Sequence, residues 1–224
     1  MRSKEAVLAL IRETGIVPAV RAEDARSAIK SIEAIHHAGI RAVEIIMTEP
    51  GAISVLEQAV AALGEHLAIG AGTVLDPESA LRSVAAGADF MAGPSANPET
   101  MKVAALHSMA VFPGALTPTE VLAARRAGAD AVKIYPCGLA GGPKYIRALK
   151  APFPGIEMIA NGGVTLETVG DYCKAGVLAV GVGSGLVDPG HMREGRFVVF
   201  EERARRFLEA IAVARRSINA AATG

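Results

Sequence analysis

The sequence contains no tryptophan, and aromatic residues make up only 4% of its 224 residues. It also has no excess of charge of one sign, because 23 lysine and arginine residues balance 23 aspartate and glutamate residues. Proteins that bind nucleic acid usually carry a basic patch, often with aromatic side chains interleaved. The composition therefore predicts no nucleic-acid partner.

Long hydrophobic runs are absent as well, whereas a membrane-spanning helix takes about 20 apolar residues. The opening stretch MRSKEAVLALIRETG has charges on both sides of a short apolar segment and no signal-peptide cleavage pattern. Cysteine is scarce, and Cys137 and Cys173 match no metal or redox spacing. We expect no membrane partner and a cytoplasmic location.

What the sequence does contain is a repeated pattern, in which a helical segment ends at a glycine and an apolar strand follows. The pattern occurs in HHAGIRAVEI (36–45), AAGADFMAGP (85–94), RRAGADAVKIYP (125–136) and CKAGVLAVGVGS (173–184). Other candidate strands lie at 15–20, 67–73, 109–114 and 156–163. Eight βα units in about 200 residues predict an α/β fold, a (β/α)8 TIM barrel that forms a single domain over 1–224.

The two ends of the chain predict helices outside this repeat. Residues 1–14 indicate an extra N-terminal helix that covers the floor of the barrel, and residues 194–217 indicate an amphipathic closing helix. A doubly wound open sheet is the alternative fold. It usually has a glycine-rich turn after its first strand, and the corresponding segment here, VRAEDARS, has no glycine.

Two charged residues lie within predicted strands. Side chains alternate between the faces of a strand, so Lys133 in DAVKIY and Glu44 in AVEII point into the barrel while their apolar neighbours face the helices. The pair lies near the carboxyl ends of the strands, where TIM-barrel active sites are found. A lysine in such a site can form a Schiff base with a carbonyl substrate. A purely structural ion pair is the alternative.

Glycine-rich turns follow the last two predicted strands, in NGGVTLET and VGSGL. Phosphate groups usually bind at this position of a barrel, where backbone N–H groups can approach an anion. We therefore predict that Gly162, Gly163, Gly183 and Ser184 bind a phosphate. The alternative is that these glycines only shape tight turns.

Taken together, these segments resemble the 2-keto-3-deoxy-6-phosphogluconate and 2-keto-3-deoxy-6-phosphogalactonate aldolases, which are class I aldolases. The likeness extends from about residue 5 to about residue 210. The segments that carry it are IVPAVRAED, AGIRAVEI, IGAGTVLDPE, FPGALTPTE, AVKIYP, GGPKYIRALKAPFP, NGGVTLET and GVGSGLV.

The resemblance implies roles for individual residues. Lys133 forms the imine with the substrate ketone, and Glu44 transfers protons through water. The other implied substrate-binding residues are Arg21 and Thr73 for the carboxylate, Pro94 and Tyr135 for the pocket wall, and Gly162, Gly163, Gly183 and Ser184 for the phosphate. The resemblance also implies a phosphorylated keto acid as substrate, no metal or other cofactor, and a homotrimer.

Two departures from the family pattern concern the choice of sugar acid. Many phosphogluconate-type members have an arginine four residues after the glutamate, whereas EIIMTEP has Thr48 followed by Glu49. Asn161 stands where the family tends to have threonine or valine. We expect Thr48 to reach the bound chain and to allow weak discrimination between the epimers, with a preference for the galactonate form.

Other functions remain open at this level. A sugar-phosphate isomerase or epimerase would use the same fold without an imine lysine, and a non-catalytic barrel would only bind a ligand. A metal enzyme is a further alternative, but the five histidines show no paired ligand spacing.

Overall fold

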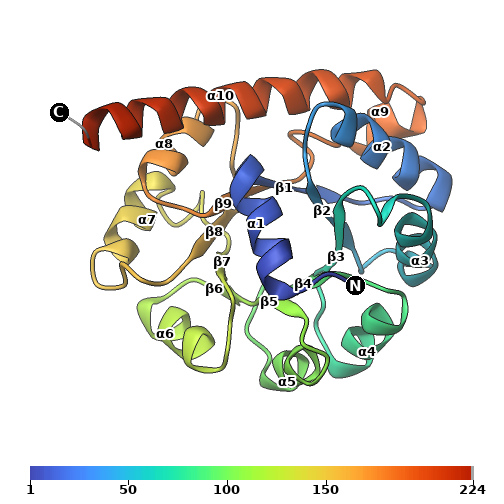
Figure 1. The fold of residues 1–224 in the computed structure, drawn as a ribbon, viewed down its shortest axis with the longest axis horizontal. Helices are drawn as coiled ribbons and strands as arrows, with labels where there is room; N and C mark the ends of the chain where they lie inside the picture. Colours follow the sequence, from blue (N-terminus) through green and yellow to red (C-terminus); the bar gives the residue numbers. More distant parts are fainter. Residues whose placement is uncertain (223–224) are drawn as a thin grey trace.

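The computed structural model describes residues 1–222 and shows a ring of parallel strands surrounded by helices (Figure 1). The strands are β1 (Ile16–Val20), β2 (Ala42–Ile46), β3 (Ala68–Gly72), β4 (Phe90–Ala92), β5 (Ala110–Phe112), β6 (Gly114–Ala115), β7 (Val132–Ile134), β8 (Met158–Asn161) and β9 (Ala179–Val182). Their hydrogen-bonded order is β5-β4-β3-β2-β1-β9-β8-β7-β6. The predicted α/β barrel is confirmed.

The nine strands described in residues 1–222 correspond to the eight predicted ones, because the fifth is interrupted at Pro113. β5 pairs with β4, and β6 pairs with β7. Proline has no N–H to donate to a neighbouring strand, while its carbonyl still accepts from Lys133 N at 2.9 Å. β5 and β6 are the first and last strands of the hydrogen-bonded order, and only Pro113 separates them along the chain. The barrel is therefore nearly closed.

Helices cover the outside of this ring and follow the strands in sequence. They are α2 (Ala25–His37), α3 (Ala52–Leu63), α4 (Pro77–Ala85), α5 (Pro98–Leu106), α6 (Pro118–Arg126), α7 (Pro143–Lys150), α8 (Val169–Lys174), α9 (Pro189–Arg193) and α10 (Val198–Ala222). Several begin at a side-chain cap, as when Thr117 and Glu120 form a reciprocal capping box at α6. The predicted closing helix is α10.

The repeated glycines end the helices as expected. Gly39, Gly87, Gly128 and Gly176 all have positive φ angles, between 83° and 110°. Glycine adopts this left-handed conformation without the steric penalty of a Cβ atom. Each glycine therefore ends one helix and turns the chain toward the next strand.

The N-terminal helix α1 (Lys4–Thr14) lies across one end of the barrel (Figure 1). Val7 and Ile11 are fully buried and pack with the apolar interior residues of the strands. Two ion pairs fasten the start of the chain to strand ends, Arg2 to Asp89 at 2.9 Å and Lys4 to Asp130 at 3.1 Å. The predicted floor helix is confirmed, and it leaves the opposite end of the barrel as the mouth.

No helix within residues 1–222 combines the length and the apolar character that a bilayer crossing requires. Both cysteines are free thiols, with Cys137 buried and Cys173 partly buried. The same residues bring no three histidine, cysteine, aspartate or glutamate side chains together in a metal-binding arrangement.

Candidate active site

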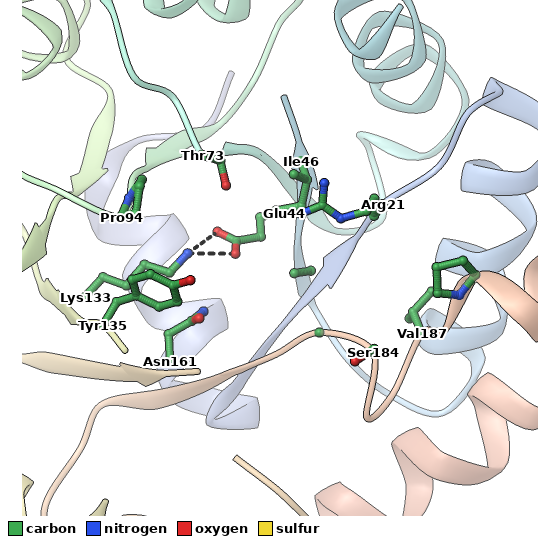
Figure 2. A pocket seen from close by; sticks show the side chains of 13 residues that line it. Arg21, Glu44, Ile46, Thr73, Pro94, Lys133, Tyr135, Asn161, Ser184 and Val187 are labelled. Atoms are coloured by element: carbon green, nitrogen blue, oxygen red, sulfur yellow. Dashed lines mark hydrogen bonds and ion pairs between the residues drawn. The ribbon is translucent and has the colours of Figure 1, made fainter. Parts of the chain in front are cut away.

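The mouth of the barrel contains a cavity of about 390 Å³. Its lining residues are Ala19, Arg21, Glu44, Ile46, Thr73, Pro94, Lys133, Tyr135, Asn161, Gly183, Ser184, Val187 and Pro189. They come from the carboxyl ends of strands far apart in the sequence, so the parallel barrel itself assembles the site (Figure 2). A small organic ligand fits a cavity of this size.

Lys133 and Glu44 lie at the base of this cavity and contact each other. Lys133 Nζ donates to Glu44 Oε1 at 2.8 Å and to Oε2 at 3.0 Å. Their side chains are only 7% and 4% exposed. Their strand neighbours Val43 and Val132 pack in the apolar layer between barrel and helices, so the alternation predicted from the sequence is confirmed.

Such a buried pair has a chemical consequence. Removing two charges from water costs several kcal/mol for each, and their mutual attraction offsets that cost only with good geometry. The short contact also provides a path for a proton to pass from the ammonium of Lys133 to the carboxylate of Glu44. That transfer leaves a neutral amine, which is the nucleophilic form of lysine.

Gly72 shows how closely the site is packed around Glu44. A Cβ atom at Gly72 would lie 2.9 Å from Glu44 Cδ. A side chain at this position would therefore push the end of the Glu44 side chain out of its observed place. The adjacent residue, Thr73, has a φ angle of 58°, which is an uncommon conformation for a β-branched residue.

Arg21 lies on the other side of Glu44 from Lys133 (Figure 2). It directly follows β1 and donates from Nη1 to Thr48 Oγ1 at 2.7 Å, and the same nitrogen contacts the carboxylate of Glu49. Thr48 is not among the cavity-lining residues. The expectation that Thr48 reaches a bound substrate directly is therefore not supported, since its hydroxyl is engaged by Arg21.

The two predicted phosphate turns lie side by side, because β8 and β9 are paired neighbours. Gly183 and Ser184 line the cavity, whereas Gly162 and Gly163 do not. The backbone N–H groups of all four residues donate to no other group within residues 1–222. Four free N–H donors at adjacent strand ends form an environment that suits an anion.

Gly162 and Gly163 also have a structural requirement. Both have positive φ angles, 87° and 84°. A Cβ atom would lie 3.2 Å from the Tyr135 ring at Gly162 and 3.1 Å from Gly138 Cα at Gly163. These two glycines therefore also allow the loops after β7 and β8 to pack together, and Gly138 N donates to Gly162 O at 2.7 Å.

Five cavity-lining residues were not among the predicted site residues. Ala19, Ile46 and Asn161 lie on strands, whereas Val187 and Pro189 lie on the loop after β9 and at the start of α9. The alternation of strand side chains could have identified two of them. Ala19 lies two positions before Arg21, and Ile46 lies two positions after Glu44. The side chain of Asn161 lies over Gly181, where a Cβ atom would be 2.0 Å from Asn161 Nδ2. No periodic signal marks the loop residues.

Comparison with known proteins identifies the family of this chain. The family model described as KDPG and KHG aldolase matches residues 7–200. The chain belongs to this aldolase family. It is accordingly a carbon–carbon lyase, and the isomerase, epimerase and non-catalytic alternatives are not favoured.

Individual relatives show how extensive the similarity is. A 2-dehydro-3-deoxy-6-phosphogalactonate aldolase from Escherichia coli strain K12 is 37% identical over 86% of this chain and 90% of its own length. A structure described as native KDPGal is 34% identical, with a TM-score of 0.84 over 90% of this chain and 96% of its own.

A third relative is informative about chemistry. A crystal structure of KDPG aldolase from Legionella pneumophila contains pyruvate captured as a covalent carbinolamine intermediate. It is 26% identical to this chain, with a TM-score of 0.83 over 88% of this chain and 96% of its own.

Proposed function

We propose that this aldolase cleaves a 2-keto-3-deoxy-6-phospho sugar acid to pyruvate and glyceraldehyde 3-phosphate, with Lys133 as the imine-forming residue. The observation that carries the proposal is the buried contact of Lys133 Nζ with both carboxylate oxygens of Glu44 at the base of the mouth cavity. The covalent carbinolamine in the Legionella relative supports the same chemistry.

The first half of the reaction joins substrate and enzyme. Glu44 accepts a proton from Lys133, and the neutral amine attacks the C2 ketone of the keto acid. The resulting carbinolamine loses water, with Glu44 returning a proton to the departing hydroxyl. The product is a protonated imine beside the Glu44 carboxylate, which is close enough to stabilise its positive charge.

The second half breaks the carbon–carbon bond. Glu44, directly or through water, takes the proton of the C4 hydroxyl while the C3–C4 electron pair moves toward the iminium nitrogen. Glyceraldehyde 3-phosphate leaves, and an enamine of pyruvate remains on Lys133. Protonation at C3 and addition of water then release pyruvate and restore the amine.

The remaining cavity residues hold the two ends of the substrate in this proposal. Arg21 and Thr73 bind the carboxylate, and Pro94 and Tyr135 form the wall beside Lys133. The free N–H groups of Gly162, Gly163, Gly183 and Ser184, at the ends of β8 and β9, bind the phosphate. Both ends of the substrate are anionic, and each meets positively polarised donors.

We also propose that the galactonate epimer is the preferred substrate, although discrimination is weak. The 37% identical relative from Escherichia coli is a phosphogalactonate enzyme. Position 48 is a threonine that does not line the cavity, so no arginine side chain enters the cavity from there. A pocket without a dedicated hydrogen-bond partner selects by about a hundredfold at most.

Assembly and location complete the proposal. We propose that residues 1–224 act as a single domain, since the helices surround one barrel in the described part. Exposed apolar side chains around α4 and α5, namely Leu75, Leu81 and Leu106, are available for contacts between subunits of a homotrimer. The free cysteines fit a reducing cytoplasm.

A coupled assay tests the function. Each phosphorylated keto acid is supplied separately, and released pyruvate is measured by NADH oxidation with lactate dehydrogenase. We expect release from both epimers, faster with the galactonate form, and none with Lys133→Ala. Absence of pyruvate from either epimer contradicts the proposed reaction, and a preference of more than about a thousandfold for the gluconate epimer contradicts the specificity.

A further inference from the structure

Arg21 is held by two side chains that belong to the same turn. Its Nη1 donates to Thr48 Oγ1 at 2.7 Å and contacts Glu49 Oε1. The register of the paired strands explains the meeting, because Ala19 of β1 lies opposite Glu44 of β2. The residue after β1 and the turn after β2 therefore lie together at the rim of the mouth.

The turn that carries Glu49 is itself anchored. Met47 N donates to Gly72 O at 2.9 Å, and Ala52 N donates to Glu49 O at 3.1 Å. Gly51, with a φ angle of 75°, then leads into α3. The side chain of Glu49 is 24% exposed, whereas that of Arg21 is 50% exposed. The anchored carboxylate of Glu49 thus contacts the more exposed Arg21, whose only other side-chain hydrogen bond in the described residues is to Thr48.

The contacts leave one edge of the guanidinium open. Arginine has five N–H donors arranged in a rigid plane. Nη1 donates to Thr48 and Glu49, while Nε and Nη2 of Arg21 donate to no group that the structure describes in residues 1–222. Nε and Nη2 form the edge that binds a carboxylate through two parallel hydrogen bonds.

Other charged residues near Arg21 make no such contact. A neighbouring cavity of about 260 Å³ shares Arg21 and is also lined by Glu23, Asp24 and Arg193. None of these three forms an ion pair with Arg21 among the described residues. Glu49 is therefore the acidic side chain that orients Arg21.

We propose that Glu49 is a positioning residue, which fixes Arg21 with its free edge toward the mouth so that it receives the substrate carboxylate. This inference rests on the proposed function, in which Arg21 binds that carboxylate. Ordering a long side chain at the moment of binding has an entropic cost. Glu49 and Thr48 order Arg21 before the keto acid arrives, so the cost of ordering is met in the folded protein.

The test separates binding from turnover. Pyruvate is titrated into the protein with sodium borohydride, and the concentration for half the maximal initial rate of Lys133 reduction is measured. The saturating rate of cleavage is measured with the phosphorylated keto acid. In Glu49→Ala we expect the half-saturating pyruvate concentration to rise about two- to fivefold, as for loss of one half-exposed ion pair, with an unchanged saturating rate.

Three further variants assign the effect to Arg21. Glu49→Gln keeps an acceptor oxygen for Nη1, so we expect it to stay within about twofold of the wild-type concentration. Glu23→Ala removes an exposed carboxylate of the adjoining cavity that does not contact Arg21, and we expect no change. In an Arg21→Ala background, Glu49→Ala should have no additional effect, because the group it positions is absent.

Two results would contradict the proposed role of Glu49. An unchanged or lowered half-saturating concentration in Glu49→Ala overturns the inference, and a lowered value would mean that Glu49 competes with the substrate for Arg21. If the wild-type protein forms the adduct and Glu49→Ala shows an unchanged or lowered half-saturating concentration, only the role of Glu49 is overturned and the proposed function stands. Absence of any adduct in the wild-type protein overturns the proposed function as well.

Discussion

Lys133 Nζ lies within 3.0 Å of both carboxylate oxygens of Glu44, and the two side chains reach each other from strands on different parts of the barrel wall. In the proposed mechanism, a single carboxylate is thus in contact with the reacting nitrogen throughout imine formation and cleavage. Its position suits a group that accepts and returns protons several times in one cycle.

Replacement of Glu44 by glutamine tests that role. The amide keeps the size of the side chain and can still accept from Lys133, but it cannot take up a proton. We expect Glu44→Gln to lower the rate of cleavage by about 10²- to 10⁴-fold while the thermal unfolding midpoint changes little. Turnover close to wild type would show that Glu44 serves only as an ion-pair partner.

Thr73 offers a test of strain at the site. Its φ angle of 58° costs about 1–3 kcal/mol for a non-glycine residue. Glycine removes the strain but adds about 0.5–1 kcal/mol of conformational entropy cost. We expect Thr73→Gly to leave the free energy of unfolding unchanged or higher by up to about 2 kcal/mol. The KM for the keto acid should rise, because the hydroxyl proposed to bind the substrate carboxylate is lost.

Urea unfolding and steady-state kinetics of the same preparation check both parts. Thr73→Ala is the matched control, because it loses the hydroxyl but keeps the strained backbone. A Thr73→Gly protein that is less stable than Thr73→Ala would contradict the strain argument.

Asp188 gives a pH-dependent prediction. Burial raises its pKa, but the His191 N–H, the Arg203 guanidinium and the His191 ring outweigh that effect and lower the pKa to about 2. The carboxylate joins α10 to the loop that lines the mouth, through contacts of 2.7 Å with Arg203 Nη1. Its charged form is therefore stabilised in the folded protein.

The sign of the pH effect follows. A carboxyl group whose pKa is lower in the folded state stabilises the fold above its ordinary pKa, near 3.8, and that contribution is lost as the pH falls toward about 2. We expect wild-type protein to be more stable than Asp188→Asn at pH 7, with the difference shrinking below about pH 4. Urea unfolding at pH 7, 5 and 3 measures it, and a constant difference would refute the assignment.

The floor helix is expected to be essential for stability. Ile11 is fully buried against the barrel interior, and replacing such an isoleucine with alanine typically costs about 2–5 kcal/mol. Val198→Ala is the control, because Val198 is 63% exposed and exposed sites usually change stability by less than about 0.5 kcal/mol. Equal effects of the two substitutions on denaturant unfolding would mean that α1 is not part of the core.

The sequence predicted the barrel and the Lys133–Glu44 pair because both depend on local periodicity. Helix, glycine and strand repeat along the chain, and an alternation of two assigns each strand residue to a face. The partner of Arg21 was missed, since the contact with Glu49 depends on the register of β1 against β2 and on a turn that no period describes. The interruption at Pro113 was also missed, because it reflects how the ring closes.

The most direct test of the account is mass spectrometry of the protein after reduction with borohydride in the presence of pyruvate. The account predicts one added adduct per chain, on the peptide that contains Lys133, and its complete loss in Lys133→Ala with the fold retained. An adduct on another lysine such as Lys144, or no adduct at all, would contradict an imine mechanism at Lys133.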